Sequence, residues 1–313
     1  MHGVNAVPPR KQDRRCSRAG RPARWMAVLL AAALGAGGCG EAGSSGGGAR
    51  RPAAPATSGE FDLLTYNVHG LPDSFARGRT PSRDVPLIGP LLNGYTLVLV
   101  QEDFWYHDEL AAQALHAYRS VPLSGHTTPL NDGLNRFSDL PLGPHVRIPW
   151  AACYGLYDAG NDCLAAKGFA VSSVELAAGV AIWVYNLHAD AGGGIADAGT
   201  RELQFAQLRE HILREAAGRA LIVAGDTNLH GFDPQDEPVL QDFMAATGLA
   251  DSCRFLGCGQ ERIDRVLFRG GADVALQPVL WRIATEFVDA SGRDLSDHKA
   301  IHVRFRWSLQ ARP

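Results

Sequence analysis

Short apolar runs that end in Asn, Asp, Glu or His recur along this chain, and they constrain its fold more than any other feature. The runs are rich in Val, Ile, Leu and aromatic residues, which is typical of β-strands. They cover residues 61–68, 96–101, 180–187, 221–224, 262–268 and 300–307. Some are apolar throughout, so some strands are expected to be buried on both faces.

Helical spacing of apolar residues predicts further elements between these strands. The predicted helices cover residues 108–118, 201–217 and 238–247, with Gly248 as a C-cap of the last one. Because strands and helices alternate, the fold class is predicted to be α/β or α+β. Residues 131–150 and 153–163 are expected to form a long irregular stretch, and long loops in compact domains are often functional.

The first 60 residues do not resemble a folded domain. A basic stretch in residues 10–24 precedes an apolar run at 25–34 and small residues before Cys39. This order is typical of an export signal, and the run is short for a membrane span. Residues 1–39 are therefore predicted to be an export signal, with Cys39 as a lipidation site. An ordinary cleaved signal, or a true start nearer Met26, are the alternatives.

The rest of the chain divides into three predicted parts. Residues 40–60 form a flexible tether rich in Gly, Ser and Pro, residues 61–307 one folded domain, and residues 308–313 a tail. We expect the protein to be exported, and either lipid-anchored to the bacterial membrane or secreted.

Four cysteines lie in the predicted domain, as two pairs that are close in sequence. In an exported protein this arrangement predicts disulfides Cys153–Cys163 and Cys253–Cys258. A zinc site is the weaker alternative, because neither pair has the two-residue spacing common in structural zinc sites.

The charge of the exported part disfavours a nucleic-acid partner. Beyond residue 39 the chain has 23 basic and 32 acidic residues, and only two are lysines, Lys167 and Lys299. Binding to nucleic acid usually relies on many contacts between Lys or Arg and phosphate. A local basic groove remains compatible with this composition.

The polar residues at the ends of the runs suit the hydrolysis of a phosphate ester, which needs a metal, a base and help for the leaving oxygen. Glu102 follows one run, and Mg²⁺ is typically held by one or two carboxylates. Asp226 and Asn228 are two residues apart and can face one site. Asp264 can orient His298 as an acid orients a catalytic imidazole. Each motif taken alone has an ordinary explanation as a turn or a surface charge.

The ordered set of these residues resembles the endonuclease/exonuclease/phosphatase superfamily over residues 61–307. The set consists of Asn67, Glu102, His188, Asp226, Asn228, Asp264, Asp297 and His298. Its most specific parts are the Gly-Asp-x-Asn and Ser-Asp-His motifs. The resemblance implies a deoxyribonuclease I-like fold, a four-layer sandwich of two mixed β-sheets flanked by helices.

The resemblance also implies a metal site. Glu102 would be the main ligand of Mg²⁺ or Mn²⁺, with Asn67 beside it, and Asp297 would support the site.

The remaining residues of the set would act on protons and phosphate. His298 would be the general base, oriented by Asp264. Asp226 and Asn228 would bind or polarise the phosphate and water, and His188 would stabilise the phosphoryl oxygen or protonate the leaving group.

Within the superfamily the chain resembles secreted sphingomyelinase C-like phosphodiesterases. Lys167-Gly168-Phe169 is similar to their Lys-Gly-Phe/Val element, and the segment around His188 to their Thr-His-Leu-Gln segment. This chain departs from the pattern by having Asn186-Leu187 before the histidine. Residues 270–296 are too few for the long aromatic hairpin that some of those enzymes insert into membranes.

The predicted function is therefore an exported metal-dependent phosphodiesterase that acts on a phospholipid headgroup at a membrane surface. Lys167, Trp150 and Tyr154 are the candidate substrate residues, since a cationic choline group suits aromatic neighbours; Trp105, Tyr106 and Tyr157 lie in similar loops. An extracellular nuclease of the same superfamily and a non-catalytic surface binding module are the alternatives. The sequence indicates no protein partner.

Overall fold

The computed structural model describes residues 56–310 except 157, 158 and 261, and twelve strands of this part form two sheets. The first sheet contains β1 (Ser58–Asn67), β2 (Leu97–Gln101), β3 (Tyr118–Arg119), β4 (Asn135–Ser138), β11 (Val274–Ile283) and β12 (Ile301–Leu309). The second contains β5 (Val146–Pro149), β6 (Gly168–Ala177), β7 (Val180–His188), β8 (Leu221–Asp226), β9 (Ala250–Asp251) and β10 (Asp264–Arg269).

Both sheets are mixed. Their strand orders are β11-β12-β1-β2-β4-β3 and β5-β6-β7-β8-β10-β9. The central pairs β1–β2 and β7–β8 run parallel, and the other pairs are antiparallel. Each parallel pair therefore brings two carboxyl ends to the same edge of its sheet.

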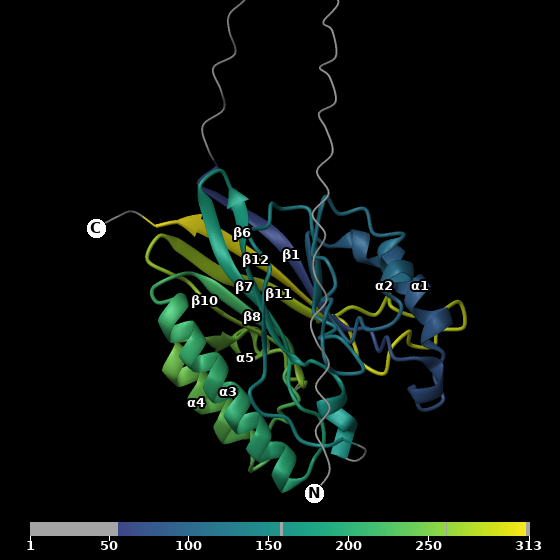
Figure 1. Cartoon of the computed structure of the whole chain (residues 1–313). Coiled ribbons are helices and arrows are strands. Elements are labelled where there is room, and N and C mark those ends of the chain that lie inside the picture. Colours follow the sequence, from purple (N-terminus) through teal and green to yellow (C-terminus); the bar gives the residue numbers. More distant parts are fainter. Residues whose placement is uncertain (1–55, 157–158, 261, 311–313) are drawn as a thin grey trace, which may run out of the picture. The chain divides into compact units, whose positions relative to one another are not determined.

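Helices cover the outer faces of the two sheets (Figure 1). α1 (Pro81–Leu91) and α2 (His107–Ala111) pack on the first sheet, and α3 (Ile195–Glu215) and α4 (Asp236–Thr247) on the second. The short α5 (Ser252–Leu256) follows β9, and three 3-10 turns lie at Asp73–Phe75, Leu92–Gly94 and Ala159–Leu164.

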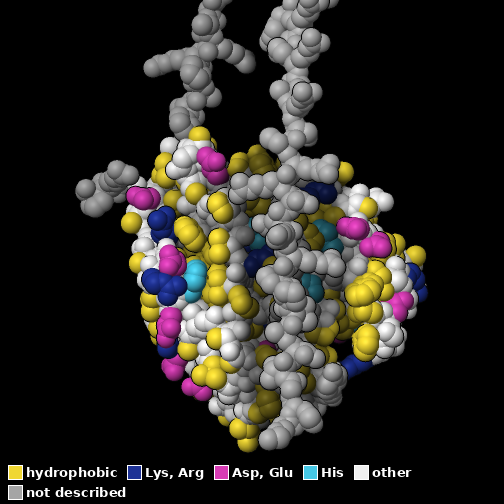
Figure 2. All heavy atoms as spheres, viewed as in Figure 1, with side chains coloured by type: hydrophobic (Ala, Val, Ile, Leu, Met, Phe, Trp, Pro, Cys, Tyr) yellow, Lys and Arg dark blue, Asp and Glu magenta, His cyan; other side chains and the backbone are white. Residues whose placement is uncertain are grey.

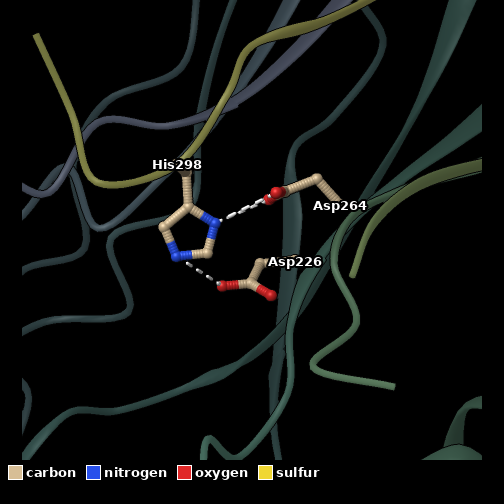
Figure 3. Close-up of side chains that lie close together, drawn as sticks. All are labelled: Asp226, Asp264 and His298. Carbon is tan, nitrogen blue, oxygen red and sulfur yellow. Dashed lines mark hydrogen bonds and ion pairs between the residues drawn. The ribbon is translucent and has the colours of Figure 1, made fainter. Parts of the chain in front are cut away.

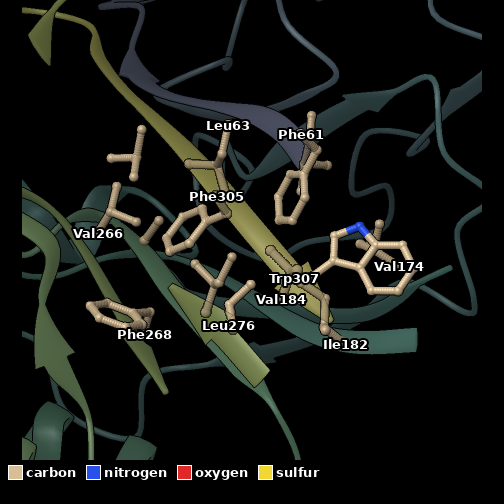
Figure 4. Close-up of a cluster of buried hydrophobic side chains, with 14 of the residues drawn as sticks. Phe61, Leu63, Val174, Ile182, Val184, Val266, Phe268, Leu276, Phe305 and Trp307 are labelled. Carbon is tan, nitrogen blue, oxygen red and sulfur yellow. The ribbon is translucent and has the colours of Figure 1, made fainter. Parts of the chain in front are cut away.

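The alternation of side chains along each central strand separates the layers. In β2, Leu97 and Leu99 enter the core between the sheets, whereas Val98 and Val100 pack with α1 and α2. β8 alternates in the same way between the inner core and the helices α3 and α4. Figure 4 shows the inner core, to which both sheets contribute side chains. The predicted four-layer sandwich is confirmed.

The predicted helix at 108–118 is wrong over most of its length, because α2 ends at Ala111. The Arg119 guanidinium donates to the carbonyls of Ala111 and His116, each at 3.1 Å. The Leu115 N–H donates to Asn93 Oδ1 at 2.7 Å. These bonds replace those that a continuing helix would make.

The other two predicted helices differ less from the structure. α3 begins at Ile195, six residues before the predicted start, and the Asp197 carboxylate accepts from the Gly194 N–H at 2.8 Å in its first turn. α4 ends at Thr247, and the next residue, Gly248, is left-handed with φ 69°, so its predicted C-cap role is confirmed.

The stretch at 131–150 is not irregular throughout, since it contains β4 and β5. β4 escaped prediction because its residues are mostly polar. Asn135, Arg136 and Ser138 are nevertheless buried in it, and each is hydrogen-bonded.

The limits of the predicted domain also need correction. β1 begins at Ser58, within the predicted tether, and β12 ends at Leu309, within the predicted tail. Ser58 is paired with Ser308 across these strands. The predicted export signal with Cys39, most of the tether, and Tyr157 lie outside the described residues.

Both predicted disulfides are present in the structure. The Cα atoms of Cys153 and Cys163 are 5.4 Å apart, and those of Cys253 and Cys258 are 5.0 Å apart. The first bridge closes the loop before β6, and the second spans α5. None of the helices in the described part of the chain has the length and apolar character of a bilayer span.

Candidate active site

The ends of the four central strands meet at one edge of the sandwich. Asn67 ends β1 and is paired in register with Gln101, which precedes Glu102. His188 ends β7 and is paired with Asp226, the last residue of β8. β10 runs antiparallel to β8, and its first residue, Asp264, also pairs with Asp226. Strand register therefore gathers side chains that are far apart in sequence.

Glu102 adopts a strained turn directly after β2. Its φ is 54°, which is uncommon for residues other than glycine. The Gly70 N–H donates to the Glu102 carbonyl at 2.9 Å, and a Cβ at Gly70 would lie only 2.5 Å from that oxygen. Main-chain packing thus fixes the turn, which directs the Glu102 side chain toward Asn67.

The Asn67 amide joins two carboxylates. Its Nδ2 donates to Glu102 Oε1 at 3.0 Å and to Asp226 Oδ2 at 3.1 Å. Its Oδ1 accepts from the His69 N–H at 3.1 Å. The other Glu102 oxygen, Oε2, is buried and has no hydrogen-bond partner among the described residues. A buried anionic oxygen without a donor is unfavourable unless a cation approaches it.

Asp226 lies at the centre of the site. Its Oδ2 is 3.4 Å from His188 Nε2 and 3.6 Å from His298 Nε2, and its Oδ1 accepts from the Asn228 N–H at 3.1 Å. Burial acts to raise the pKa of Asp226. The charge of His298, together with that of Lys167 and the hydrogen bond from Asn67, outweighs it and holds this pKa below its usual range. Asp226 is therefore a carboxylate.

Asp264 and His298 form a hydrogen-bonded pair (Figure 3). Both Asp264 oxygens lie 3.0 Å from His298 Nδ1, and burial raises the pKa of Asp264. Burial acts to lower the pKa of His298, but the carboxylates of Asp226 and Asp264 raise it to about 10. The pair fixes the ring so that Nε2 faces Asp226.

His188 is the second imidazole of the site and has the opposite character. Burial holds its pKa well below the usual range, and the Lys167 charge acts in the same direction. Its Nδ1 has no hydrogen-bond partner among the described residues. His188 is therefore neutral, with one ring nitrogen toward Asp226.

Asp297 and His69 complete the site on the side of Glu102. His69 Nδ1 lies 3.2 Å from Asp297 Oδ1 and 3.7 Å from Glu102 Oε2. His69 was not among the predicted site residues, although it lies only two residues after Asn67; its φ of 52° is unusual for a residue other than glycine. A histidine two residues after a strand that ends in Asn is the feature of the sequence that could have indicated this site residue.

The Asn228 side chain is hydrogen-bonded to the main chain and not to the carboxylates of the site. The residue is left-handed, with φ 49°, and its Nδ2 donates to the Ala189 carbonyl at 3.0 Å. This bond fixes the residue that follows His188. The predicted role of Asn228 toward phosphate and water stays a prediction.

Two of the three candidate substrate residues are not placed as expected. Trp150 is buried, and its indole N–H donates to the His188 carbonyl at 2.7 Å, so it supports the strand end rather than an open binding surface. Lys167 forms an ion pair with the buried Asp162 and donates to the Ala189 carbonyl at 3.3 Å. Tyr154 is exposed on its loop, as a substrate contact requires.

One group of potential metal ligands stands out among the described residues. Asp226, Asp264 and His298 each offer an atom within 4.8 Å of the others. Mg²⁺ prefers oxygen ligands, however, and the His298 ring is already hydrogen-bonded to Asp264. The carboxylate oxygens of Glu102 and Asp226 are the better match for Mg²⁺, and the Asn67 amide lies between them with its Nδ2 toward both.

The sequence is similar to those of curated proteins named sphingomyelinase. The chain is 33% identical over 273 residues to the sphingomyelinases of Mycobacterium bovis and Mycobacterium tuberculosis, covering 80% of this chain and 53% of each relative. The chain thus spans about half the length of the curated relatives it matches. No protein-family model matches the chain.

Solved structures share the fold at low sequence identity. Sphingomyelinase C from Streptomyces griseocarneus superposes with a TM-score of 0.61 at 20% identity, covering 79% of this chain and 99% of that chain. Beta toxin from Staphylococcus aureus with bound magnesium ions has a TM-score of 0.57 at 16% identity, and the match covers 78% of this chain and 99% of that chain. TDP2 from D. rerio in complex with a single-strand DNA product has a TM-score of 0.58 at 17% identity, and the match covers 79% of this chain and 98% of that chain.

Proposed function

We propose that the folded part of this chain, which is similar to sphingomyelinases, belongs to the endonuclease/exonuclease/phosphatase superfamily and hydrolyses a phosphodiester by metal-assisted attack of water. The observation that carries the proposal is the Asp264–His298 pair, which lies at the same edge of the sandwich as Glu102 and Asn67. A base oriented by an acid is thereby combined with oxygen ligands for a cation.

The site fits a hard divalent cation, Mg²⁺ or Mn²⁺. Glu102 would be its main ligand, with Asn67 beside it, and Asp297 would support it from the side of His69. The buried Glu102 Oε2, which lacks a donor among the described residues, is the specific feature that such an ion would satisfy. When bound, the ion would neutralise charge on the phosphoryl oxygens.

Each imidazole has a distinct proton role in this proposal. His298 would accept the proton of the attacking water at Nε2, while Asp264 holds Nδ1–H and stabilises the imidazolium. Because its pKa is raised to about 10, His298 must first lose a proton, and positive charge brought to Glu102 favours that loss. His188, which is neutral, would donate a hydrogen bond to the phosphoryl or leaving oxygen.

We propose a choline phospholipid of the sphingomyelin type as the substrate. The curated relatives are named sphingomyelinases, and the acidic exported part of the chain suits a zwitterionic lipid better than a polyanion. On the left of the face viewed in Figure 2, basic side chains lie among acidic ones. The two disulfides suit an exported protein, and lipidation at Cys39 stays part of the proposal.

Exposed apolar side chains on the loops around the site would contact the lipid surface. Four of them lie in the connections that follow β1, β2, β7 and β8, up to the first residue of α3. Tyr154 and Leu156 lie on the loop bonded to Asp190. The set is Phe75, Trp105, Tyr154, Leu156, Ile195 and Phe232. Large apolar side chains exposed together often mark a membrane contact.

Trp105 gives a test of this contact. Its side chain is 62% exposed and lies three residues after Glu102. Its main-chain N–H donates to the Gly70 carbonyl at 3.0 Å. We expect Trp105→Ala to lower hydrolysis of sphingomyelin in vesicles by roughly 10-fold, because insertion of the indole is lost. Hydrolysis of a short-chain monomeric analogue should change little. Leu115→Ala, exposed at the end of the α2 region, is the control; equal losses on both substrates would contradict the assignment.

The substrate class is tested by comparing sphingomyelin, phosphatidylcholine, an inositol phosphate and plasmid DNA, each with Mg²⁺ and with chelator at physiological salt. We expect release of phosphorylated headgroup from sphingomyelin to exceed nicking of DNA, because nothing in the composition supports binding of a polyanion. Faster DNA nicking would establish the nuclease alternative. Binding of lipid without turnover of any substrate would support the non-catalytic module.

A further inference from the structure

His69 has no role in the proposed function, although its ring lies among the carboxylates of the candidate active site. Its side chain is buried, with 10% of its surface exposed. Its Nδ1 lies 3.2 Å from Asp297 Oδ1 and 3.7 Å from Glu102 Oε2. The ring therefore faces anionic oxygens from two distant parts of the chain.

The main chain fixes the direction of this ring. His69 is left-handed, with φ 52°, and its N–H donates to Asn67 Oδ1 at 3.1 Å. The N–H of the next residue, Gly70, donates to the Glu102 carbonyl at 2.9 Å. Histidine is among the residues other than glycine that tolerate this conformation best. His69 thus lies in a turn whose hydrogen bonds connect it to both Asn67 and Glu102.

Asp297 is held close to the same turn. Ser296 Oγ donates to the Asn67 carbonyl at 2.7 Å and accepts from the His298 N–H at 3.1 Å. These two bonds anchor the segment that carries Asp297 to the end of β1. The fold therefore brings the Asp297 carboxylate within reach of His69 Nδ1.

The proton of a neutral His69 ring lies on the side away from these carboxylates. Nε2 is 3.4 Å from the Ala76 carbonyl oxygen, which can only accept a hydrogen bond. With the proton on Nε2, Nδ1 presents its lone pair to Asp297 and Glu102. Glu102 Oε2 is itself buried and has no hydrogen-bond partner among the described residues. Lone pairs that face one another repel, so a cation between them would stabilise all three groups.

The distances from Nδ1 fit the coordination of one small divalent ion. Nitrogen and oxygen ligands lie about 2.0–2.2 Å from an ion such as Zn²⁺, so two ligands of the same ion are roughly 3–4 Å apart. The separations of 3.2 and 3.7 Å lie within this range. Each carboxylate is therefore spaced from the imidazole as two ligands of a single ion are.

We propose that His69 Nδ1 is a nitrogen ligand of the divalent ion held by Glu102, and that it makes the site select first-row transition metals over Mg²⁺. Imidazole suits Co²⁺ and Zn²⁺, whereas Mg²⁺ takes oxygen ligands and keeps its waters. The inference rests on the proposed function for the presence of an ion at Glu102. It adds which side chain decides the identity of that ion.

Calorimetric titration of Co²⁺ and of Mg²⁺ into the metal-free full chain tests this role without any substrate. The unaltered chain should bind Co²⁺ at least roughly 10-fold more tightly than Mg²⁺. His69→Asn, which tolerates the left-handed backbone, should weaken Co²⁺ binding by roughly 10–100-fold and Mg²⁺ binding by less than about 3-fold. The visible absorption spectrum of bound Co²⁺ should also change in His69→Asn, because an oxygen replaces a nitrogen ligand.

Two control variants accompany this titration. His126→Asn, at an exposed histidine, should bind both ions normally. Glu102→Gln should weaken the binding of both ions, because it alters the main ligand. If His69→Asn does not fold, His69→Gln is titrated in its place.

The opposite sign of the effect would overturn the inference. A positively charged His69 ring, paired with the carboxylates in place of a metal, would repel cations, and its replacement would then strengthen the binding of both ions. An unchanged ratio of the two affinities in His69→Asn, with weakened binding in Glu102→Gln, would overturn the inference and leave the proposed function standing. Failure of the unaltered chain to bind either ion would overturn both.

Discussion

Glu102→Gln is expected to lower turnover of the preferred phosphodiester by several orders of magnitude while the protein stays folded. The substitution keeps the size of the side chain and an oxygen that can accept from Asn67 Nδ2. It removes the negative charge on the buried Oε2, which lacks a donor among the described residues. Affinity for Mn²⁺, measured by calorimetry, should fall together with turnover.

The matched control for this prediction is Glu109→Gln, an exposed acid in the first turn of α2. It should have normal turnover and normal metal affinity. Full activity of Glu102→Gln, or full activity of the unaltered chain in chelator, would contradict the metal assignment.

His298→Ala is expected to lower turnover by about 10²–10⁴-fold, the contribution typical of a positioned general base. The imidazole contacts two buried carboxylates, Asp264 at 3.0 Å and Asp226 at 3.6 Å, and no other described histidine is hydrogen-bonded to Asp264. Substrate binding should change much less than turnover, because the base acts in the chemical step.

His126→Ala controls for the loss of a histidine as such, because His126 is exposed on the loop before β4. It should leave turnover unchanged. Near-normal turnover in His298→Ala, with a native circular dichroism spectrum, would show that another group accepts the proton.

The sequence predicted which side chains lie close together where strand register decides the geometry. Asn67, His188 and Asp226 end strands whose apolar runs are unmistakable, and parallel pairing brings such ends together. The burial of β2 and β8 on both faces also follows from the sequence, because a strand that is apolar at every position has no polar face to expose to solvent.

The errors arose where tertiary bonds between distant residues decide local structure. The α2 region looked helical, but the side chains of Arg119 and Asn93 take over its main-chain groups. Trp150 looked like an exposed loop aromatic, but its indole reaches the His188 carbonyl in the interior. β4 resembled a loop because most of its residues are polar. These residues are nevertheless buried, because they form hydrogen bonds that no local sequence pattern reveals.

The central claim is that water attacks phosphorus at the site formed by Glu102, Asp264 and His298. The most direct measurement is hydrolysis of sphingomyelin in ¹⁸O-labelled water, with mass spectrometry of both products. We predict one ¹⁸O atom in the released phosphocholine, none in the ceramide, and no product in chelator. Label in the ceramide hydroxyl, or labelled product formed without a divalent ion, would contradict the account.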